Sequence, residues 1–433
     1  MDLTHIGIIG IIILIIFLFS NMPVGFVMGL VGLGGFIYVK GIGPGLNLLA
    51  SDVFEIFSSY GLTVIPLFVL MGQLSFQSGI SRRLFEAAYV MLGNRKGGLA
   101  MATIGTCAGF SAISGSTNAT AVTMATVALP EMKRYGYNMG LATGTVAAGG
   151  SLGILIPPST IFIVYGILTE QSIGKLFMAG ILPGILLTFL FMAAIYIVVT
   201  LNPSLAPEGP KTDFKEKISS FVGILETVFL FIIVMGGIFF GIFTPTEAAA
   251  IGAFATLFMA IVRKQISWRG FIKALAATTQ TSCMVMVIVA GATIFGHFMA
   301  VTRVPYELSV WAGSLSLPSS LIMIIIILIY LLGGCFMDAF AMIMLTVPIF
   351  APLAETLGFD LIWFGVVIVL IGEMGVITPP VGINVYVVHG IARDVPLETI
   401  FKGVMPLLAA LIICNLLILL FPEIALYLPN LMR

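Results

Sequence analysis

Two apolar stretches of the chain each carry a pair of consecutive prolines surrounded by glycines. The first is GGSLGILIPPSTIFIVYGI, Gly149–Ile167, and the second is GEMGVITPPVGINVYVVHGI, Gly372–Ile391. A proline within a helix removes one backbone hydrogen bond and clashes with the preceding turn, at a cost of about 3 kcal/mol. In a membrane, the freed backbone groups are tolerated only where protein or a polar cavity surrounds them. The pattern therefore predicts two discontinuous helices around a binding site near the middle of the membrane.

Such breaks offer ligands of two kinds. A new helix N-terminus carries a partial positive charge that favours an anion. Freed carbonyls, hydroxyls and amides supply the oxygen atoms that hard cations such as Na⁺ prefer. Helices that simply end at the membrane surface would also explain the prolines, but the long apolar flanks favour breaks. The candidate ligands for substrate and cation are Ser151, Gly153, Pro157, Pro158 and Ser159 at the first break, and Gly375, Thr378, Pro379, Pro380, Gly382 and Asn384 at the second.

Two further polar clusters lie at the turns of predicted re-entrant hairpins. The legs of the first hairpin, 97–112 and 119–129, would be about 24 and 17 Å long as helices, too short for the roughly 30 Å hydrocarbon core. The small polar residues between them also allow close helix packing, but five exceed what packing needs. The candidate site residues at the two turns are Ser114, Gly115, Ser116, Thr117 and Asn118, and then Gly333, Gly334 and Asp338.

Asp338 is the charged member of these turns. A carboxylate in the middle of a bilayer costs about 2.5–3.5 kcal/mol on insertion scales, so it is expected to have a function. Asp338 would either neutralise a bound cation or form a structural pair, and the sequence favours the cation. No basic side chain is expected near the breaks or turns. An anionic substrate would therefore depend on helix dipoles, amide and hydroxyl donors, and bound Na⁺.

Composition sets the protein class. Of the 433 residues, 60% are hydrophobic and 9% are charged, whereas soluble domains carry about 25% charged residues. The fold class is therefore an all-α polytopic membrane protein. The sequence contains no Walker A motif, so ATP does not drive the chain directly. It shows no catalytic dyad or metal-ligand cluster, so we expect no enzyme, no cofactor apart from Na⁺ as coupling ion, and no nucleic-acid partner.

The remaining elements follow from hydrophobic periodicity. In the first half we expect an amphipathic surface helix at 81–92, and in the second half a charged surface helix at 263–273. A second hairpin is expected at about 319–350, and a polar cytoplasmic linker at 201–220. The expected membrane spans, including the broken helices 139–168 and 361–391, are 6–19, 24–39, 61–76, 139–168, 176–200, 227–241, 247–262, 278–300, 361–391 and 401–421.

The two halves share one plan. Pro23 and Pro245 are 222 residues apart, and the two Pro-Pro pairs keep the same offset. This register indicates an internal duplication of 1–200 in 221–433. Five spans in each half are an odd number, so the second copy would be inverted. That arrangement places 15 of the 19 basic residues on one side, which the positive-inside rule assigns to the cytoplasm.

Four segments carry a resemblance to a known family: FSAISGSTNATAVTM, GGSLGILIPPS, KLFMAGILPG and GVITPPVGINVYV. Together they resemble the dicarboxylate-type M subunit, the large membrane subunit of TRAP (tripartite ATP-independent periplasmic) transporters. The resemblance implies elevator-type, Na⁺-coupled uptake of an organic acid, a C4-dicarboxylate or related carboxylate, across a bacterial or archaeal inner membrane. It also implies a small four-helix membrane subunit and a periplasmic substrate-binding protein as partners.

Two other functions stay open at this point. A stand-alone sodium/dicarboxylate symporter of the divalent-anion family would share the hairpins and breaks. A membrane-embedded enzyme or scaffold would need catalytic or metal-binding residues at membrane depth. Transport by the chain alone would favour the symporter, whereas transport that needs three components would favour the tripartite system.

Overall fold

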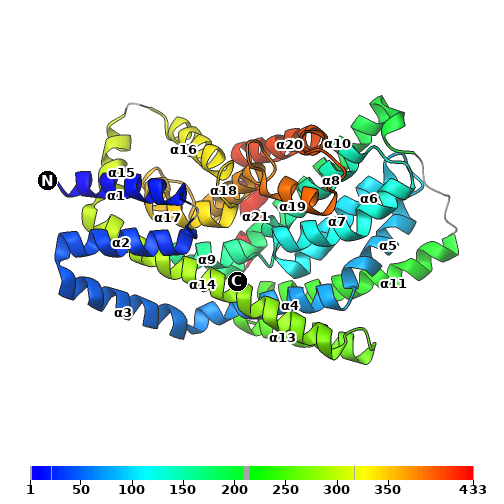
Figure 1. The fold of residues 1–433 in the computed structure, drawn as a ribbon, viewed down its shortest axis with the longest axis horizontal. Helices are drawn as coiled ribbons and strands as arrows, with labels where there is room; N and C mark the ends of the chain where they lie inside the picture. Colours follow the sequence, from blue (N-terminus) through cyan, green and yellow to red (C-terminus); the bar gives the residue numbers. More distant parts are fainter. Residues whose placement is uncertain (1, 21, 208–213, 316, 433) are drawn as a thin grey trace.

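The computed structural model describes residues 2–20, 22–207, 214–315 and 317–432, and the regular structure in these ranges is helical (Figure 1). Seven of the described helical segments are long and apolar enough to cross a membrane. They are 60–77, 139–168, 173–201, 245–262, 268–302, 339–356 and 397–420. Six shorter apolar helices accompany them. The all-helical, multi-span membrane architecture expected from composition is confirmed.

The first half of the chain runs from α1 to α10. Its helices are α1 (Leu3–Leu18), α2 (Val24–Lys40), α3 (Ile42–Ser58), η1 (Tyr60–Thr63), α4 (Val64–Gln77), α5 (Ile80–Leu92), α6 (Gly98–Ser114), α7 (Thr117–Arg134), α8 (Met139–Leu155), α9 (Thr160–Leu168) and α10 (Ile173–Leu201). The short turn η2 (Pro203–Leu205) follows.

The second half runs from α11 to α21. Its helices are α11 (Phe214–Phe231), η3 (Ile232–Gly236), α12 (Gly237–Phe239), α13 (Pro245–Val262), α14 (Trp268–Thr302), α15 (Val304–Ser314), α16 (Ser319–Gly334), α17 (Ala339–Thr356), α18 (Leu361–Gly375), α19 (Ile383–Ile391), α20 (Leu397–Leu420) and α21 (Glu423–Leu431).

The helix bounds of the two halves follow the 222-residue offset. Helices α7 and α17 begin at Thr117 and Ala339, and α8 and α18 begin at Met139 and Leu361. The caps correspond as well. The Oδ1 atom of Asn138 accepts from two backbone N–H groups at the start of α8, and that of Asp360 does the same at α18. These side chains satisfy donors that a helix start leaves free.

One expected correspondence is wrong. The surface helix at 81–92 exists as α5, but the offset places α15, not 263–273, at the equivalent position. Residues 263–267 form a turn, and α14 then continues for 35 residues without interruption. The difference follows from the residues that stop helices. In the first half the chain is divided into α3 and α4 near Gly61 and Pro66, whereas α14 contains no proline and is not divided. The sequence analysis did not foresee α15.

Several expected bounds shift. The first hairpin extends to α6 and α7, about 26 and 27 Å long at 1.5 Å per residue, and the second reaches Thr356 rather than residue 350. Part of the expected linker at 201–220 is helical, because α11 begins at Phe214; residues 208–213 lie outside the described ranges. Helices α8 and α18 continue to Leu155 and Gly375, so the irregular segments are 156–159 and 376–382.

The centre of the molecule is built around α8 and α18. Residues 140–155 of α8 and 362–375 of α18 are all buried, as expected for helices that are largely apolar on every side; the exceptions include the buried Glu373 on α18. Helix α20 packs closely along α8, since a Cβ atom on Gly403 would lie 1.8 Å from the Gly140 carbonyl oxygen. A second packed group contains α2 along α14 and α4 along α13. The hairpins, the broken helices, α10 and α20 thus form one group, and α2, α4, α13 and α14 another.

Candidate functional site

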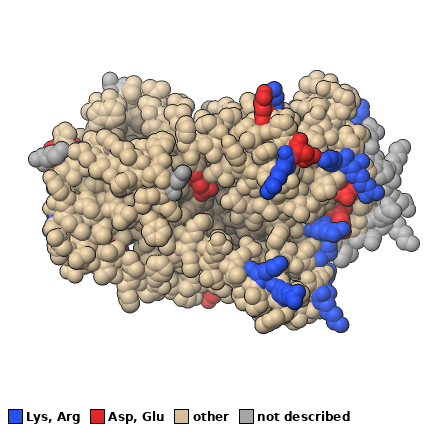
Figure 2. All heavy atoms as spheres, viewed as in Figure 1, with Lys and Arg blue, Asp and Glu red and all other residues tan. Residues whose placement is uncertain are grey.

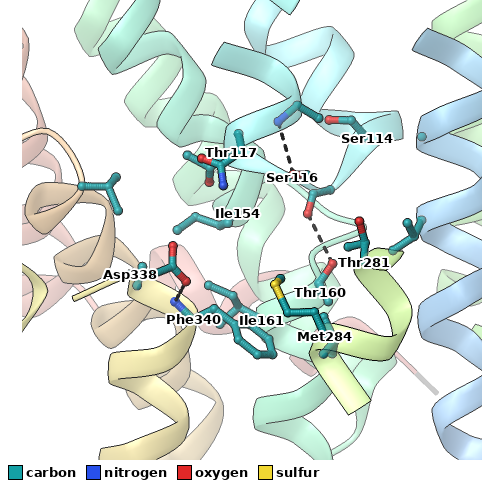
Figure 3. Close-up of a pocket in the computed structure, with 18 of the residues that line it drawn as sticks. Ser114, Ser116, Thr117, Ile154, Thr160, Ile161, Thr281, Met284, Asp338 and Phe340 are labelled. Carbon is teal, nitrogen blue, oxygen red and sulfur yellow. Dashed lines mark hydrogen bonds between the residues drawn. The ribbon is translucent and has the colours of Figure 1, made fainter. Parts of the chain in front are cut away.

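Both hairpin turns and both broken helices meet at one cavity of about 120 Å³ (Figure 3). Helices α4 and α14 close its remaining side. In Figure 3, Asp338 approaches the cavity from one side, and Thr281 and Met284 from another. Elements that are far apart in the sequence therefore line a single partly open site.

Four helices of the described chain begin at this cavity: α7, α9, α17 and α19. Residues of their first turns line it, namely Thr117, Asn118, Ala119, Thr160, Ile161, Ala339, Phe340, Ile383 and Asn384. A helix N-terminus presents free N–H groups and the equivalent of about half a positive charge. The convergence of these ends gives the cavity a polarity that suits an anion without any basic side chain.

The first hairpin turn is held by its own hydrogen bonds. Gly115 ends α6 in the left-handed conformation, with φ of 58°, and the hydroxyl of Ser116 accepts from the Ala119 N–H at the start of α7. The Ser114 and Thr120 hydroxyls lie 3.1 Å apart. Only Gly115 and Ser116 are non-helical, so the turn is shorter than the expected five residues.

The first turn also packs directly on the first break. A Cβ atom on Gly115 would lie 2.2 Å from the Pro158 carbonyl oxygen, and one on Gly153 would lie 2.5 Å from the Ser116 carbonyl oxygen. The Thr160 hydroxyl donates to the Gly115 carbonyl at 3.4 Å. Glycine is required at these positions because backbone meets backbone.

The second hairpin turn contributes the only charged side chain among the described residues that line the cavity. An Asp338 carboxylate oxygen accepts from the Phe340 N–H at 3.0 Å, which caps α17, and the side chain is open to the cavity. Asp338 occupies the position equivalent to Ser116, 222 residues later. The two caps are therefore matched in place but differ in charge.

Each broken helix contains a cis Pro-Pro peptide bond, at 157–158 and at 379–380. The Ser159 hydroxyl accepts from Phe162 N–H and caps α9, whereas Gly382, with φ of 60°, precedes α19. The side-chain amide of Asn384 donates to the Ala147 carbonyl at 3.0 Å and so joins α19 to α8. Its Oδ1 atom has no partner within the described ranges, and neither does the hydroxyl of Thr117.

Some of the expected site residues line the cavity in the structure, and others do not. Those that line the cavity are Ser114, Gly115, Ser116, Thr117, Asn118, Asp338 and Asn384. Those that do not are Ser151, Gly153, Pro157, Pro158, Ser159, Gly333, Gly334, Gly375, Thr378, Pro379, Pro380 and Gly382. The Ser151 and Thr378 hydroxyls bond to the helix carbonyls of Ala148 and Met374, so these two side chains support the helix ends.

Three polar residues that line the cavity were missed by the sequence analysis: Gln73 on α4, Thr160 on α9 and Thr281 on α14. Thr160 directly follows the expected Ser151–Ser159 segment, so its position next to the predicted break could have marked it as a candidate. Gln73 and Thr281 are single polar residues within apolar spans, a pattern that marks a candidate but does not reveal which way the side chain faces.

The oxygen donors around the cavity also suit a hard cation such as Na⁺. They comprise the Asp338 carboxylate, the Thr117 hydroxyl and the Asn384 Oδ1 atom, the last two without hydrogen-bond partners among the described residues. In the parts of the chain that the structure describes, no group of three His, Cys, Asp or Glu side chains forms a metal site. These oxygen atoms suit an alkali cation, whereas an anion would use the free N–H groups of the four helix starts.

Comparison with protein families gives a match over residues 11–424 to the model described as "Tripartite ATP-independent periplasmic transporter, DctM component". The chain belongs to this family. It is therefore the large permease subunit of a tripartite transporter, a multi-pass protein of the cytoplasmic membrane and not an enzyme. The resemblance seen in the sequence is confirmed, and the stand-alone symporter of another family is excluded.

Curated relatives of this DctM-family chain share about a third of its residues. It is 36% identical to the C4-dicarboxylate TRAP transporter large permease protein DctM of Pseudomonas aeruginosa, over 92% of the chain and 93% of the relative. It is 34% identical to the sialic acid large permease SiaM of Vibrio cholerae, covering 96% of both. It is 35% identical to the isethionate permease DctMQ of Oleidesulfovibrio alaskensis, over 95% of the chain but only 64% of the relative.

Solved structures with the same fold come from other transporters. The Alcanivorax borkumensis YdaH transporter matches with a TM-score of 0.66 at 15% identity, over 88% of the chain and 90% of that protein. Neisseria gonorrhoeae MtrF, described as one of a class of antimetabolite efflux pumps, matches with a TM-score of 0.59 at 14% identity, over 89% and 85%. At these identities the likeness concerns the fold alone.

Proposed function

We propose that this large permease subunit carries an organic acid, a C4-dicarboxylate or related carboxylate, inward together with Na⁺. The observation that carries the proposal is the convergence of four helix N-termini on one cavity. Carboxylates bind at such ends through N–H donors and the helix dipole. The named relatives transport C4-dicarboxylates, sialic acid and isethionate, all of which are organic acids.

Na⁺ would bind at the hairpin turns and helix breaks. Asp338 is the charged group of the cavity, and its free oxygen lone pairs face the same space as the Thr117 hydroxyl. A bound cation would neutralise the carboxylate before the substrate's carboxylate arrives, which removes the repulsion between the two anions. The ion would thereby favour substrate binding by its differential affinity for the loaded site.

Movement would follow an elevator scheme based on an inverted repeat. The hairpins and broken helices would move as one body, and α1–α5 with α11–α15 would form the scaffold. Figure 2 shows Lys and Arg gathered toward one end of the visible face, which would lie in the cytoplasm by the positive-inside rule. The matched helix bounds at the 222-residue offset support a duplicated plan of this kind.

The partners would be a small four-helix membrane subunit and a periplasmic substrate-binding protein. The family description names a tripartite, periplasmic system. The isethionate relative, named DctMQ, extends beyond the part that this chain matches. The binding protein would deliver the acid, so part of the selectivity would lie outside this chain.

Reconstitution into liposomes tests the proposal. The chain, the small subunit and the binding protein are combined with an inward Na⁺ gradient and a panel of C4-dicarboxylates, sialic acid and sugar acids. Uptake of one acid that needs all three proteins and the Na⁺ gradient is the expected result. Uptake that persists undiminished without the gradient would refute Na⁺ coupling, and uptake by the chain alone would refute the tripartite assembly.

A further inference from the structure

A second hollow, of about 370 Å³, lies away from the central cavity, between α6, α10 and α11. Its walls are apolar apart from two threonines, one of which, Thr188, bonds within its own helix to the Gly184 carbonyl. The side chains that define the hollow include Ala108 and Ala112 on α6, Ile185 and Phe189 on α10, and Val228 and Phe231 on α11. We call this hollow the α11 groove. Its helices lie within the membrane region, so its natural contents are apolar.

A charged cluster lies beside the groove on α5, α11 and the turn after α13. The buried Glu226 carboxylate pairs with Arg83, whose Nη2 atom lies 2.9 Å away, and also with Arg263. Nearby, Arg82 and Glu86 pair at 3.0 Å. Three arginines and two glutamates leave one net positive charge, and the Arg263 side chain is 41% exposed.

One packing contact on α5 and one pair of sequence neighbours on α11 bring the cluster next to the groove. On α5, Leu84 follows Arg83 and packs against Gly109, a groove residue, since a Cβ atom there would lie 2.9 Å from Leu84 Cδ2. On α11, Glu226 is followed by the groove residues Thr227 and Val228. The buried Thr227 hydroxyl has no hydrogen-bond partner within the described chain. The charged cluster, a hydroxyl without a partner in the described chain and the apolar wall are therefore neighbours.

We infer that the α11 groove binds an anionic phospholipid of the cytoplasmic leaflet. The phosphate would lie at the partly exposed Arg263 and Arg83 guanidinium groups, the glycerol ester region near Thr227, and one acyl chain between α6, α10 and α11. The charge complementarity decides the class of occupant. A zwitterionic lipid or another apolar helix would fill the groove but would not use the net positive charge at its end.

The binding of this lipid does not depend on which acid the cavity carries. The groove separates α6 and α10 from α11, so a bound acyl chain fills space that these helices leave between them. Its burial adds packing contacts with all three helices in the conformation that the structure describes. The lipid should therefore raise the thermal stability of the full chain.

Native mass spectrometry of the detergent-purified full chain tests the inference, with phosphatidylglycerol and phosphatidylcholine of identical acyl chains as probes. Val228→Trp fills the groove with an aromatic side chain. Its matched control is Gly43→Trp on α3, an exposed position where a Cβ atom would meet nothing within 4 Å. Arg263→Gln removes the net charge but leaves Glu226 paired with Arg83. Its control, Lys40→Gln, removes an exposed charge at the end of α2.

The wild-type chain is expected to retain phosphatidylglycerol several-fold better than phosphatidylcholine and to melt higher in its presence. Val228→Trp should lose both effects, and Arg263→Gln should bind the two lipids equally. Both controls should behave as the wild type. Equal retention of the two lipids by the wild type, or unchanged retention by both groove and cluster variants, would overturn the inference. Dimerisation that Val228→Trp abolishes would instead assign the groove to a second copy.

Discussion

The two hairpin–break pairs occupy equivalent positions in the sequence but differ in burial and charge. In the first pair the break residues 156–159 are all buried, and the turn is capped by the neutral Ser116. In the second pair, Pro379 and Pro380 are exposed, and the turn is capped by Asp338. In the first pair, Gly115 of the turn packs against the break. In the second pair, Gly334 of the turn packs against Gly375, just before the break.

This difference suggests that the two hairpin–break pairs, although duplicated, have different roles in the site. In the first pair both the turn contact and the whole break are buried, so this pair gives the cavity its more tightly packed wall. The second pair has an exposed break and a carboxylate open to the cavity, and so can respond to an ion. If this comparison is correct, substitutions at the buried contact between the first turn and its break should disrupt the site, and substitutions at the carboxylate of the second turn should change its dependence on Na⁺.

Gly115→Ala should have the largest effect. Its Cβ atom would lie 2.2 Å from the Pro158 carbonyl oxygen, in addition to the strain of φ 58° for a residue other than glycine. The turn and the break must then separate, and a displacement of this size near a binding site can reduce activity by roughly 100-fold. Uptake by the reconstituted system measures the loss.

The matched control is Gly136→Ala. Gly136 has φ of 73°, but a Cβ atom there would meet nothing within 4 Å. It therefore carries similar backbone strain, about 1–2 kcal/mol, without the collision. Uptake should stay near the wild-type level. Equal losses in the two variants would show that backbone strain alone matters and that the contact between turn and break does not.

Asp338→Asn should have the second-largest effect and should act through Na⁺. The amide oxygen of asparagine can still cap α17, but the negative charge that would face the ion is gone. Half-maximal activation of uptake should require roughly ten-fold more Na⁺, which corresponds to about 1.4 kcal/mol of binding free energy. Uptake measured against Na⁺ concentration gives this value directly.

Ser116→Ala is the companion variant at the equivalent position of the first turn. It removes a neutral cap and should cost about 1 kcal/mol of stability, with an unchanged Na⁺ concentration for half-maximal uptake. A larger shift in Na⁺ dependence for Ser116→Ala than for Asp338→Asn would reverse the roles given to the two turns.

The local features of this site could be predicted from the sequence because they carry a local cost. Prolines at 157–158 and 379–380, and polar residues at 114–118, are unfavourable in an apolar segment unless a break or turn uses them. The structure places helix ends at these segments. Asn138 and Asp360 are residue types that commonly occupy the N-cap position of a helix. Their side chains cap the first turns of α8 and α18.

The missed features depend on tertiary packing. Gln73 and Thr281 lie in α4 and α14, and their position at the cavity results from how these helices pack against the hairpins. The run 263–273 looked like a separate surface helix because its charges suit one. The same charges are compatible with the end of a long span. The continuous helix α14 in the structure decides between a separate surface helix and the end of a span.

Gly382→Ala should have a moderate effect. Gly382 precedes α19 with φ of 60°, and a Cβ atom would lie 2.8 Å from Phe401 Cε1, the tip of a side chain that can move aside. The expected cost is the backbone strain of about 1–2 kcal/mol, visible as a lower melting temperature and a several-fold loss of uptake. A loss as complete as that of Gly115→Ala would mean that the second break is as rigid as the first.

Lys133→Gln should have the smallest effect, although it breaks a link between the two halves. The Lys133 Nζ atom at the end of α7 lies 2.5 Å from Asp394 Oδ2, which follows α19. Both side chains are more than half exposed, and exposed ion pairs contribute little because water and salt screen them. We therefore expect uptake within roughly two-fold of the wild type.

The pH dependence of this pair gives a sharper version of the same test. The hydrogen bond from Lys133 lowers the pKa of Asp394. A carboxyl group with a lowered pKa stabilises the folded state above its unfolded pKa of about 3.9 and loses that contribution as the pH falls through the folded value. The melting temperatures of wild type and Lys133→Gln should therefore differ slightly at pH 7 and converge in acid. A large difference at pH 7 would mean that this surface pair, and not the buried contacts around α8 and α18, holds the two halves together.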